Sequence, residues 1–345
     1  MQRVAIVGLG LIGGSIGLGL KAWAATQGTE DKSPLFVVGF DTDLEQQSYA
    51  KKIGAVDRTE WLLPDAVVNA DLIVICTPVR AIREIFQDIA PHLKAGAVVT
   101  DVASTKANVL QWADAGLPDS VSFVGGHPMA GKAISIEGAE AGLFKGATWC
   151  VTPSVKAADP AVRTVLGLVA ALGGEPYFVD PAEHDAYVAG VSHLPFVVSS
   201  ALMNVLSRDD SWRDMKTITA GGFRDMTRLS AGSAAMHRDI VMTNRDAVLR
   251  WIDQFQGELG KLRATVAEGD GEEVEGRLTD FFEHARDARA EWATQTTREG
   301  ELLQQTGQDL SSETFGDQMG RMMMGGFFKR RIDTAERMGR KPNRR

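Results

Sequence analysis

Cysteine is scarce in this sequence, and a long apolar run is missing. Only Cys76 and Cys150 occur among 345 residues, which excludes a disulfide framework and is typical of a reducing compartment. Because no stretch of about 20 consecutive apolar residues is present, the sequence predicts no transmembrane helix. The early apolar run in MQRVAIVGLG is broken by glycines and lacks a small-residue cleavage site, unlike a signal peptide. We expect a cytoplasmic protein without a membrane partner.

Several motifs of catalysis and binding are also missing. The six histidines show no HxxxH spacing and the cysteines no CxxC spacing, so no metal site is expected. The one GxSxG match, Gly13–Gly17, lies inside a glycine-rich turn near the N-terminus, so no nucleophile elbow is expected and acyl transfer is left without support. With 37 basic and 45 acidic residues the net charge is −8, and a nucleic-acid partner is not expected.

The order of apolar segments predicts an α/β fold with two domains. Short apolar runs at 3–8, 36–41, 70–78 and 96–104 alternate with helical patterns, which is typical of a doubly wound parallel sheet. We assign residues 1–180 to this Rossmann-type domain. Residues 181–305 show helical periodicity without a strand pattern, and we expect an all-helical second domain there.

The last 40 residues, 306–345, differ from the rest in composition. They begin polar and end in a basic, methionine-rich segment, and residues 321–345 hold nine Lys or Arg and two Asp or Glu, a charge of +7. The preceding 320 residues carry 28 basic and 43 acidic residues, or −15. We expect a solvated, partly disordered tail, with an arm that binds a partner or an anion as the alternative.

A glycine-rich turn near the N-terminus predicts a dinucleotide site. Gly8, Gly10 and Gly13 form GxGxxG directly after the first strand, the context in which this weak pattern becomes specific. Gly8 permits the tight turn, Gly10 lets the backbone approach a pyrophosphate, and Gly13 allows close packing of helix on strand. Leu11 and Ile12 open a helix whose free N–H groups face the phosphates. The alternative is a glycine-rich turn without a ligand.

The acid at the end of the second strand favours NAD over NADP. Asp41 can bind the adenosine ribose hydroxyls and repel a 2′-phosphate, Asp43 adds negative charge, and no arginine follows before Arg58. The spacing from Gly13 is longer than the usual roughly 20 residues. The polar insertion at 26–34 accounts for the excess as a longer loop. A solvated turn acid is the alternative.

Three further segments carry side chains suited to catalysis or binding. DVASTK places Ser104 and Lys106 after a strand, where an open α/β sheet binds ligands; a helix cap and a surface lysine are the alternative. GGHPMAG holds His127 in an irregular loop, where an imidazole can act as acid or base. VSHLPF places His193 in an apolar helical segment, where a hydrogen-bonded core histidine is the default.

A glycine-flanked basic segment follows at 221–239. GGFRDMTRLSAGSAAMHRD carries Arg224, Arg228 and Arg238 among small residues. Arginines in such surroundings can bind carboxylates through two parallel hydrogen bonds. An ordinary basic helix face is the alternative interpretation.

Taken in order, GLGLIGGSIG, DVASTK, GGHPMAG, EHD…VSHLP and GGFRDMTRL resemble the prephenate/arogenate dehydrogenases of tyrosine biosynthesis. The resemblance covers about residues 1–300. It implies a Rossmann domain joined to a helical domain that forms a homodimer, with NAD as cofactor and an anionic substrate. It implies oxidative decarboxylation, which converts prephenate to 4-hydroxyphenylpyruvate, CO₂ and NADH, or arogenate to tyrosine; the choice between the two substrates stays open.

The resemblance also implies roles for single residues. His127 matches the family histidine that accepts the substrate hydroxyl proton, and Ser104 the serine that orients it. Arg228 matches the arginine that pairs with a substrate carboxylate. The remaining matches are His193, Lys106, Gly221 and His237 in the substrate pocket and Thr77 and Pro78 beside the cofactor.

This chain departs from the family pattern at several positions. Lys132 and Ala133 stand where relatives often have an acid after HPMAG, and Phe196 replaces the second histidine of SHLPH. His237 stands where some relatives place a pocket tryptophan. Two other readings remain open: a Rossmann-plus-helical hydroxyacid dehydrogenase, and a non-enzymatic NAD-binding sensor.

Overall fold

The computed structural model describes residues 2–26, 35–132 and 134–309, and it divides into two compact units. The first unit is Met1–Leu259 and the second is Gly260–Arg345. Helix α12 (Arg245–Ala267) begins in the first unit and ends in the second, which also holds α13 (Glu272–Asp309). All the candidate site residues lie in the first unit.

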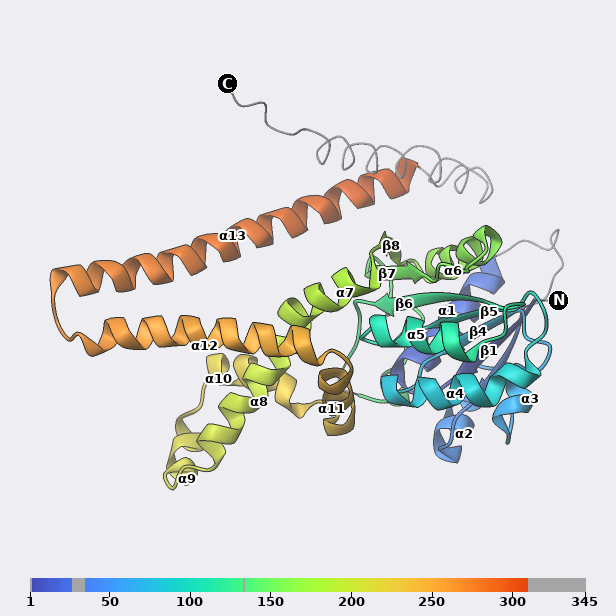
Figure 1. The fold of residues 1–345 in the computed structure, drawn as a ribbon, viewed down its shortest axis with the longest axis horizontal. Coiled ribbons are helices and arrows are strands. Elements are labelled where there is room, and N and C mark those ends of the chain that lie inside the picture. The colour runs from blue at the N-terminus through green and yellow to red at the C-terminus, as the bar shows by residue number, and fades with distance from the viewer. Residues whose placement is uncertain (1, 27–34, 133, 310–345) are drawn as a thin grey trace. The chain divides into compact units, whose positions relative to one another are not determined.

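An eight-stranded sheet forms the N-terminal part of the first unit (Figure 1). Its strand order is β3-β2-β1-β4-β5-β6-β7-β8. The strands are β1 (Gln2–Val7), β2 (Leu35–Phe40), β3 (Arg58–Thr59), β4 (Leu72–Ile75), β5 (Val98–Asp101), β6 (Ser122–Pro128), β7 (Thr148–Pro153) and β8 (Glu175–Phe178). Five of the seven pairs join β1 through β6 in parallel, so the predicted Rossmann-type sheet is confirmed.

The far edge of the sheet differs from the fully parallel prediction. β7 pairs antiparallel with β6, and β8 then pairs in parallel with β7. For β7 to run parallel to β6, the chain would have to cross back from the end of β6 to the opposite end of the sheet before β7 begins. The segment between β6 and β7 holds only the short 3₁₀-helix η3 (Ile136–Gly138) among its described residues, and β7 begins where β6 ends.

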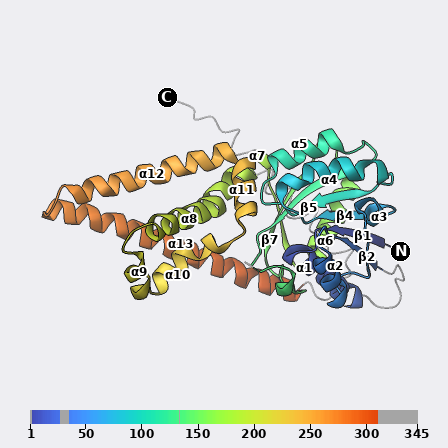
Figure 2. The ribbon, with the colours of Figure 1, turned by 90° about the horizontal axis from the view of Figure 1, so that it is seen from below.

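Helices cover both faces of the sheet because each strand sends alternate apolar side chains to opposite sides. They are α1 (Leu11–Thr26), α2 (Leu44–Lys52), α3 (Leu63–Val67), α4 (Ile82–Ile89), α5 (Ala107–Gly116) and α6 (Asp159–Ala171). One core contains Ile16 of α1 and Val165 of α6. The other contains Phe86 of α4 and Val109 of α5. Figure 2 shows α4 and α5 on one side of the sheet and α1 on the other.

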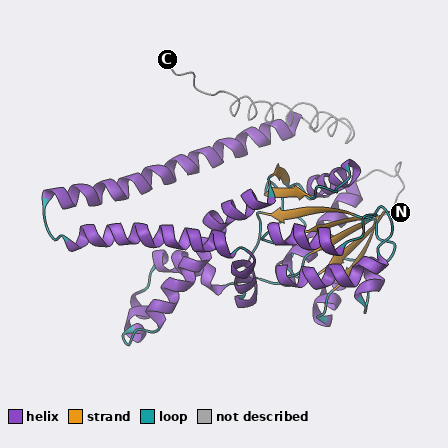
Figure 3. Cartoon of the chain, viewed as in Figure 1, coloured by secondary structure: helices purple, strands orange, loops and turns teal. Residues whose placement is uncertain are grey.

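No strand follows Phe178 in the described chain, as Figure 3 shows. The helices are α7 (Pro181–Val188), α8 (Leu194–Ser207), α9 (Trp212–Met215), α10 (Gly221–Thr227) and α11 (Ala234–Thr243), followed by α12 and α13. A π-helical turn, η4 (Ala189–His193), joins α7 to α8, and the 3₁₀-helix η6 (Arg228–Ala231) precedes α11. The predicted helical second part is therefore confirmed. Of the predicted tail, 306–309 belong to α13 and the rest lies outside the described residues.

The helical stretch Pro181–Ser207 departs from one expectation. By length and composition alone it is apolar enough to cross a membrane, and 28% of its apolar window is buried. Core helices of soluble proteins meet the same criterion. This stretch also carries buried polar side chains, His184, Asp185 and His193, that form hydrogen bonds within the first unit. Those bonds favour a helix that belongs to the folded core over one that lies in lipid.

Candidate active site

In the glycine turn, Gly8 and Gly13 pack closely against backbone atoms, whereas the space beside Gly10 is open. Gly8 has φ of 97°, and a Cβ there would lie 2.7 Å from the backbone of Cys76. A Cβ on Gly13 would lie 2.0 Å from the Gly8 carbonyl oxygen. A Cβ on Gly10 would meet no described atom within 4 Å. A ligand can therefore approach the backbone at Gly10, beside the N-terminus of α1, as a pyrophosphate requires.

Asp41 lies against this turn. Its Oδ2 accepts a hydrogen bond from the Leu9 N–H at 2.7 Å, and its Oδ1 accepts one from the Asp43 N–H at 2.9 Å. A carboxylate offers about four lone-pair sites, so capacity remains for ribose hydroxyls. The carboxylate thus joins the end of β2 to the glycine turn, where the adenosine half of NAD would bind.

Thr77 and Pro78 follow β4 on the neighbouring side of the turn. A Cβ on Gly8 would lie 3.1 Å from the Thr77 methyl group, and the Thr77 Oγ1 is buried without a hydrogen-bond partner in the described chain. Pro78 precedes the 3₁₀-helix η1 (Val79–Ala81). An unpaired buried hydroxyl costs free energy unless a ligand or water meets it. Together with the opening at Gly10, this hydroxyl fits a bound dinucleotide.

Beyond the turn, Lys106 forms a fully buried ion pair with Asp101. Both side chains are 0% exposed; the Lys106 ammonium also donates to the Gly126 carbonyl oxygen at 2.7 Å. Burial lowers the pKa of Lys106, and Asp101 opposes that shift. The expectation that Lys106 contacts substrate finds no support in this geometry. Its ammonium instead holds the end of β5 to β6.

Asp185 of α7 ties the helical part to the sheet. Its Oδ1 accepts the Lys106 N–H at 2.7 Å, and its Oδ2 accepts the Ala107 N–H at 3.0 Å. These two donors open α5, where N–H groups lack partners within the helix and the helix dipole favours an anion. The side chain is 5% exposed. Asp185 of α7 therefore caps the N-terminus of α5, within the first unit.

His127 and His184 meet beside this cap. The His127 Nδ1 lies 2.9 Å from the His184 Nε2, and the His184 Nδ1 lies 2.8 Å from the Asp185 Oδ1. His127 ends β6 and is 9% exposed. Burial, His184 and Lys106 lower the pKa of His127 well below the ordinary value. The imidazole is therefore neutral at pH 7 and can accept a proton.

His193 lies close by, in the π-helical turn. Its side chain is 0% exposed, and its Nδ1 lies 3.2 Å from the Asn244 amide nitrogen, which also donates to the Asp185 carbonyl oxygen. Burial lowers the pKa of His193 to about 4, against an opposing effect of Asp185. The Nε2 is buried, and a hydrogen bond between the ring and the Ser104 backbone also opposes the lowering of the pKa. A π-turn of this kind is frequent at functional sites.

The other predicted substrate residues lie on the helices that follow. His237 of α11 stacks on Phe196 of α8 with ring centroids 4.2 Å apart, and the Phe196 ring is 5.9 Å from that of His193. The imidazole of α11 therefore lies beside the phenyl ring that replaces the second histidine of the motif. Burial lowers the pKa of His237.

Arg228 is exposed and begins η6. The Ser230 N–H donates to the buried Ser199 hydroxyl of α8 at 3.0 Å, which fixes η6 on the helix that follows His193. Gly221 is the first, exposed residue of α10. Among the other candidates, Arg238 pairs with Asp239. The structure thus ties the Arg228 turn to the helix that starts at His193.

Ser104 and Lys132 complete the predicted set. Ser104 is half-buried between Asp101 and Lys106, at the carboxyl end of β5. Lys132 pairs with Glu140 at 2.8 Å, so its charge is partly neutralised. Ala133 lies outside the described residues.

The sequence interpretation missed four residues that the structure places in the cluster: Asp101, His184, Asp185 and Asn244. Three of them stand inside motifs that had been singled out, DVASTK and EHD. An acid at the end of a predicted strand, such as Asp101, or beside a histidine, such as Asp185, could have indicated these positions. Asn244 has no such signal, because its partners lie 51 and 59 residues away in the chain.

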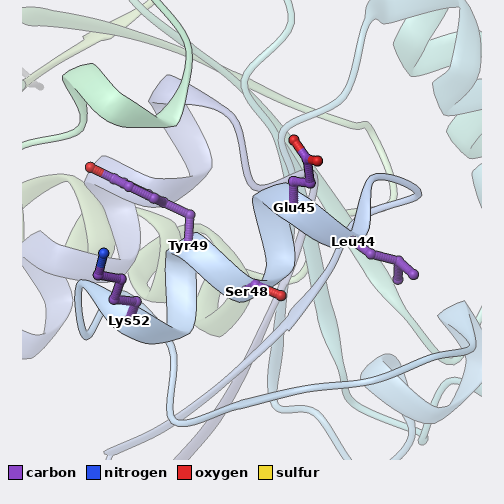
Figure 4. Close-up of a pocket in the computed structure, with 5 residues that line it drawn as sticks. All are labelled: Leu44, Glu45, Ser48, Tyr49 and Lys52. Carbon is purple, nitrogen blue, oxygen red and sulfur yellow. The ribbon is translucent and has the colours of Figure 1, made fainter.

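The structure also has a shallow hollow, of about 370 Å³, outside this cluster (Figure 4). Leu44, Glu45, Ser48, Tyr49 and Lys52 line it, and all of them belong to α2. This hollow contains none of the candidate residues. The polar cluster of His127, His184, Asp185 and His193, beside the carboxyl ends of β5 and β6, is therefore the better candidate for the active site. Among the described residues no group of three or more His, Cys, Asp or Glu could hold a metal ion.

Comparison with known proteins identifies the family of this chain. The family models described as prephenate dehydrogenase, nucleotide-binding domain and dimerization domain match residues 29–177 and 180–283. The first match begins after the glycine turn, whose assignment rests on its own geometry. A prephenate dehydrogenase of Bacillus subtilis is 34% identical over 84% of this chain and 75% of its own length. A cyclohexadienyl dehydrogenase of Zymomonas mobilis is 31% identical over 84% of this chain and 95% of its own.

A solved structure is similar over the same region. Prephenate dehydrogenase from A. aeolicus, in complex with hydroxyphenyl propionate and NAD⁺, superposes with a TM-score of 0.75 at 29% identity. The superposition covers 84% of this chain and 98% of that one. From the two matched domain models and the relatives above 30% identity, the chain belongs to the prephenate dehydrogenase family.

Proposed function

We propose that the protein oxidatively decarboxylates prephenate with NAD, giving 4-hydroxyphenylpyruvate, CO₂ and NADH for tyrosine synthesis. The observation that carries this function is the neutral, buried His127 at the end of β6, with His193 from the helical part beside it. Members of this family by name act on prephenate or arogenate. Arogenate, which would give tyrosine directly, is the close alternative.

The cofactor fits the sheet edge. Gly8, Gly10 and Gly13, with the α1 residues Leu11 and Ile12, would hold the pyrophosphate. Asp41 would hold the adenosine ribose, and Thr77 with Pro78 would lie beside the cofactor. Bound NAD supplies the hydride acceptor. The remaining requirement is a group that accepts the proton of the substrate hydroxyl.

His127 meets that requirement. Its Nδ1 is hydrogen-bonded to His184, which leaves Nε2 for the substrate hydroxyl. Its lowered pKa keeps the ring neutral at pH 7, so that one ring nitrogen is free to accept a proton. Ser104, at the end of β5, would donate or accept a hydrogen bond at the same hydroxyl.

His193 supplies a hydrogen-bond donor. Its Nδ1 faces the Asn244 amide group, which donates, so the proton of the neutral ring belongs on Nε2. The buried Nε2–H can therefore donate to a substrate oxygen, while Arg228 pairs with a carboxylate. His237 and Gly221 would border the same pocket. Because the body of the chain is acidic, capture of a dianion depends on such local cations.

We also propose that the domains divide at residue 180, that the protein is a homodimer through its helical part, and that it works in the cytoplasm. Exposed apolar side chains on the helical stretch support a dimer: Tyr187 is 55%, Val191 78% and Val205 70% exposed. A second copy would cover them. The dimerization-domain match spans this stretch.

NADH formation with prephenate or arogenate tests the activity. We expect His127→Asn to lower kcat by about 10²- to 10⁴-fold, as loss of a general base does, with NAD binding nearly unchanged. His92→Asn, in the exposed turn Ala90–His92, is the matched control and should keep full activity. No turnover of either substrate by a folded dimer would reject the proposal. Turnover of small hydroxyacids, or NADH binding without turnover, would favour the other readings.

A further inference from the structure

Three side chains form one continuous hydrogen-bonded row beside the proposed site. Asp185 contacts His184 at 2.8 Å, and His184 contacts His127 at 2.9 Å. The first two belong to α7 and the third to β6, elements that Figure 1 shows in the same part of the first unit. All three are at most 9% exposed, so water does not compete strongly for these bonds.

The row fixes which ring nitrogen carries each proton. The Asp185 carboxylate can only accept, so the His184 Nδ1 must donate. In a neutral His184 the Nε2 is then an acceptor, and the His127 Nδ1 must donate to it. The His127 Nε2 is left with its lone pair. His127 and His193 therefore hold opposite tautomers, one as acceptor at Nε2 and the other as donor.

The surroundings of the two rings differ: His127 is buried near a cation, whereas His184 contacts a carboxylate. Burial and the Lys106 ammonium from the start of α5 oppose positive charge on His127, and His193 and His184 face it from the helical part. His184 lies directly against the Asp185 carboxylate. The Asp185 carboxylate is itself held in place by hydrogen bonds from the Lys106 and Ala107 N–H groups. Asp101 lies near but is paired with Lys106.

We propose that His184, held by Asp185, fixes His127 in the Nδ1–H tautomer and then takes that proton. When the His127 Nε2 accepts the substrate hydroxyl proton, the Nδ1 proton passes to the His184 Nε2. His127 leaves the step neutral, and His184 becomes an imidazolium beside the Asp185 carboxylate. This inference deepens the proposed function. Only the proton transfer to His184 rests on that function, because the Nδ1–H tautomer of His127 exists without substrate.

Nitrogen NMR of protein labelled with ¹⁵N-histidine tests the first step. At neutral pH we expect His127 to carry its proton on Nδ1 and His193 on Nε2, with the His127 signal identified by its loss in His127→Asn. In His184→Phe the Nδ1 partner is gone, and His127 should no longer be held as the Nδ1–H tautomer. A His127 signal from the Nε2–H tautomer in the wild-type protein would overturn the proposal, whatever its activity.

Kinetics of His184→Gln test the second step. A glutamine oxygen can still accept the His127 Nδ1–H but cannot take the proton. We expect kcat to fall about 10- to 100-fold while the KM for substrate and the Kd for NAD stay within about twofold. We also expect the His127 Nδ1–H signal to persist. Full kcat with that signal retained would refute the proton transfer.

Two results separate this proposal from the proposed function. A wild-type protein that shows the Nδ1–H tautomer but turns over neither prephenate nor arogenate would refute the function and leave the tautomer assignment standing. Turnover by a wild-type protein with the opposite tautomer would refute the inference alone. Asp185 is not replaced in these tests, because it also caps α5 and its loss would change the fold.

Discussion

Replacing Lys106 by methionine distinguishes a structural lysine from a substrate-binding one. The Lys106 ammonium is fully buried and bonds to Asp101 and to the Gly126 carbonyl oxygen. Asp101 in turn accepts the Ala103 N–H at 2.9 Å and the Gly126 N–H at 3.2 Å. Lys106→Met preserves most of the side-chain volume but leaves the Asp101 carboxylate without its counter-charge.

Removing one partner of a buried ion pair costs about 3–5 kcal/mol, because the remaining charge stays desolvated. At about 1.4 kcal/mol per tenfold, the ratio of folded to unfolded protein falls by roughly 10²- to 10⁴-fold. With a urea slope of about 2–3 kcal/mol/M, the unfolding midpoint should drop by about 1–2.5 M. Adding Asp101→Asn should restore part of the loss, since the unpaired charge is removed.

Urea unfolding followed by circular dichroism measures the midpoint, and steady-state kinetics below the transition measure the KM for substrate. Lys94→Met is the control, because Lys94 pairs with Asp71 at a half-exposed site, where ion pairs contribute less than about 1 kcal/mol. We expect the KM of Lys106→Met to change by less than about twofold. An unchanged midpoint with a KM raised tenfold or more would show that Lys106 binds substrate and that the reasoning is wrong.

Three further predictions concern the cofactor turn, the carboxylate site and pH. Gly10→Val should leave the unfolding midpoint unchanged, because a side chain there meets no protein atom, but it should weaken NAD binding by at least about tenfold by filling the space of the pyrophosphate. Gly13→Ala should instead destabilise the fold, since its Cβ would lie 2.0 Å from a backbone oxygen. Arg228→Ala should raise the KM for substrate about 10- to 100-fold without a change in thermal stability, whereas Arg224→Ala, also exposed, should not; equal effects would contradict the assignment. Stability should decline as pH falls from about 6.5 toward 4, because unfolded His193 gains a proton that the folded form, with its pKa near 4, does not bind. In His193→Gln that slope should be smaller, and an identical slope would argue against a neutral buried His193.

The sheet and the glycine turn could be read from the sequence because their signals are local. The runs at 3–8 and 36–41 overlap β1 and β2 with an offset of one residue, and Gly8 after β1 adopts the positive φ that the tight turn requires. The reversed direction of β7 could not be read. Its residues 148–153 look like any buried strand, and direction depends on how the preceding loop returns.

The candidate site was only partly predictable for a related reason. His127 and His193 stand in distinctive short motifs, but nothing local says that His184 of α7 contacts one of them or that Asn244 contacts the other. For Lys106 the sequence predicted a binding role that the structure does not support. Its position after a strand suggested a ligand, and only the depth of burial and the neighbouring Asp101 reveal an internal ion pair.

The sequence by itself determined the domain types, the glycine turn and the list of histidines and arginines, because periodicity and short motifs depend on neighbours within a few residues. Only the tertiary structure decided how those groups are charged and which proton each carries. Those properties depend on burial and on partners such as His184 and Asn244, which lie 57 and 117 residues from His127 along the chain. Folding alone brings such residues to hydrogen-bonding distance, and their chemistry follows from that contact.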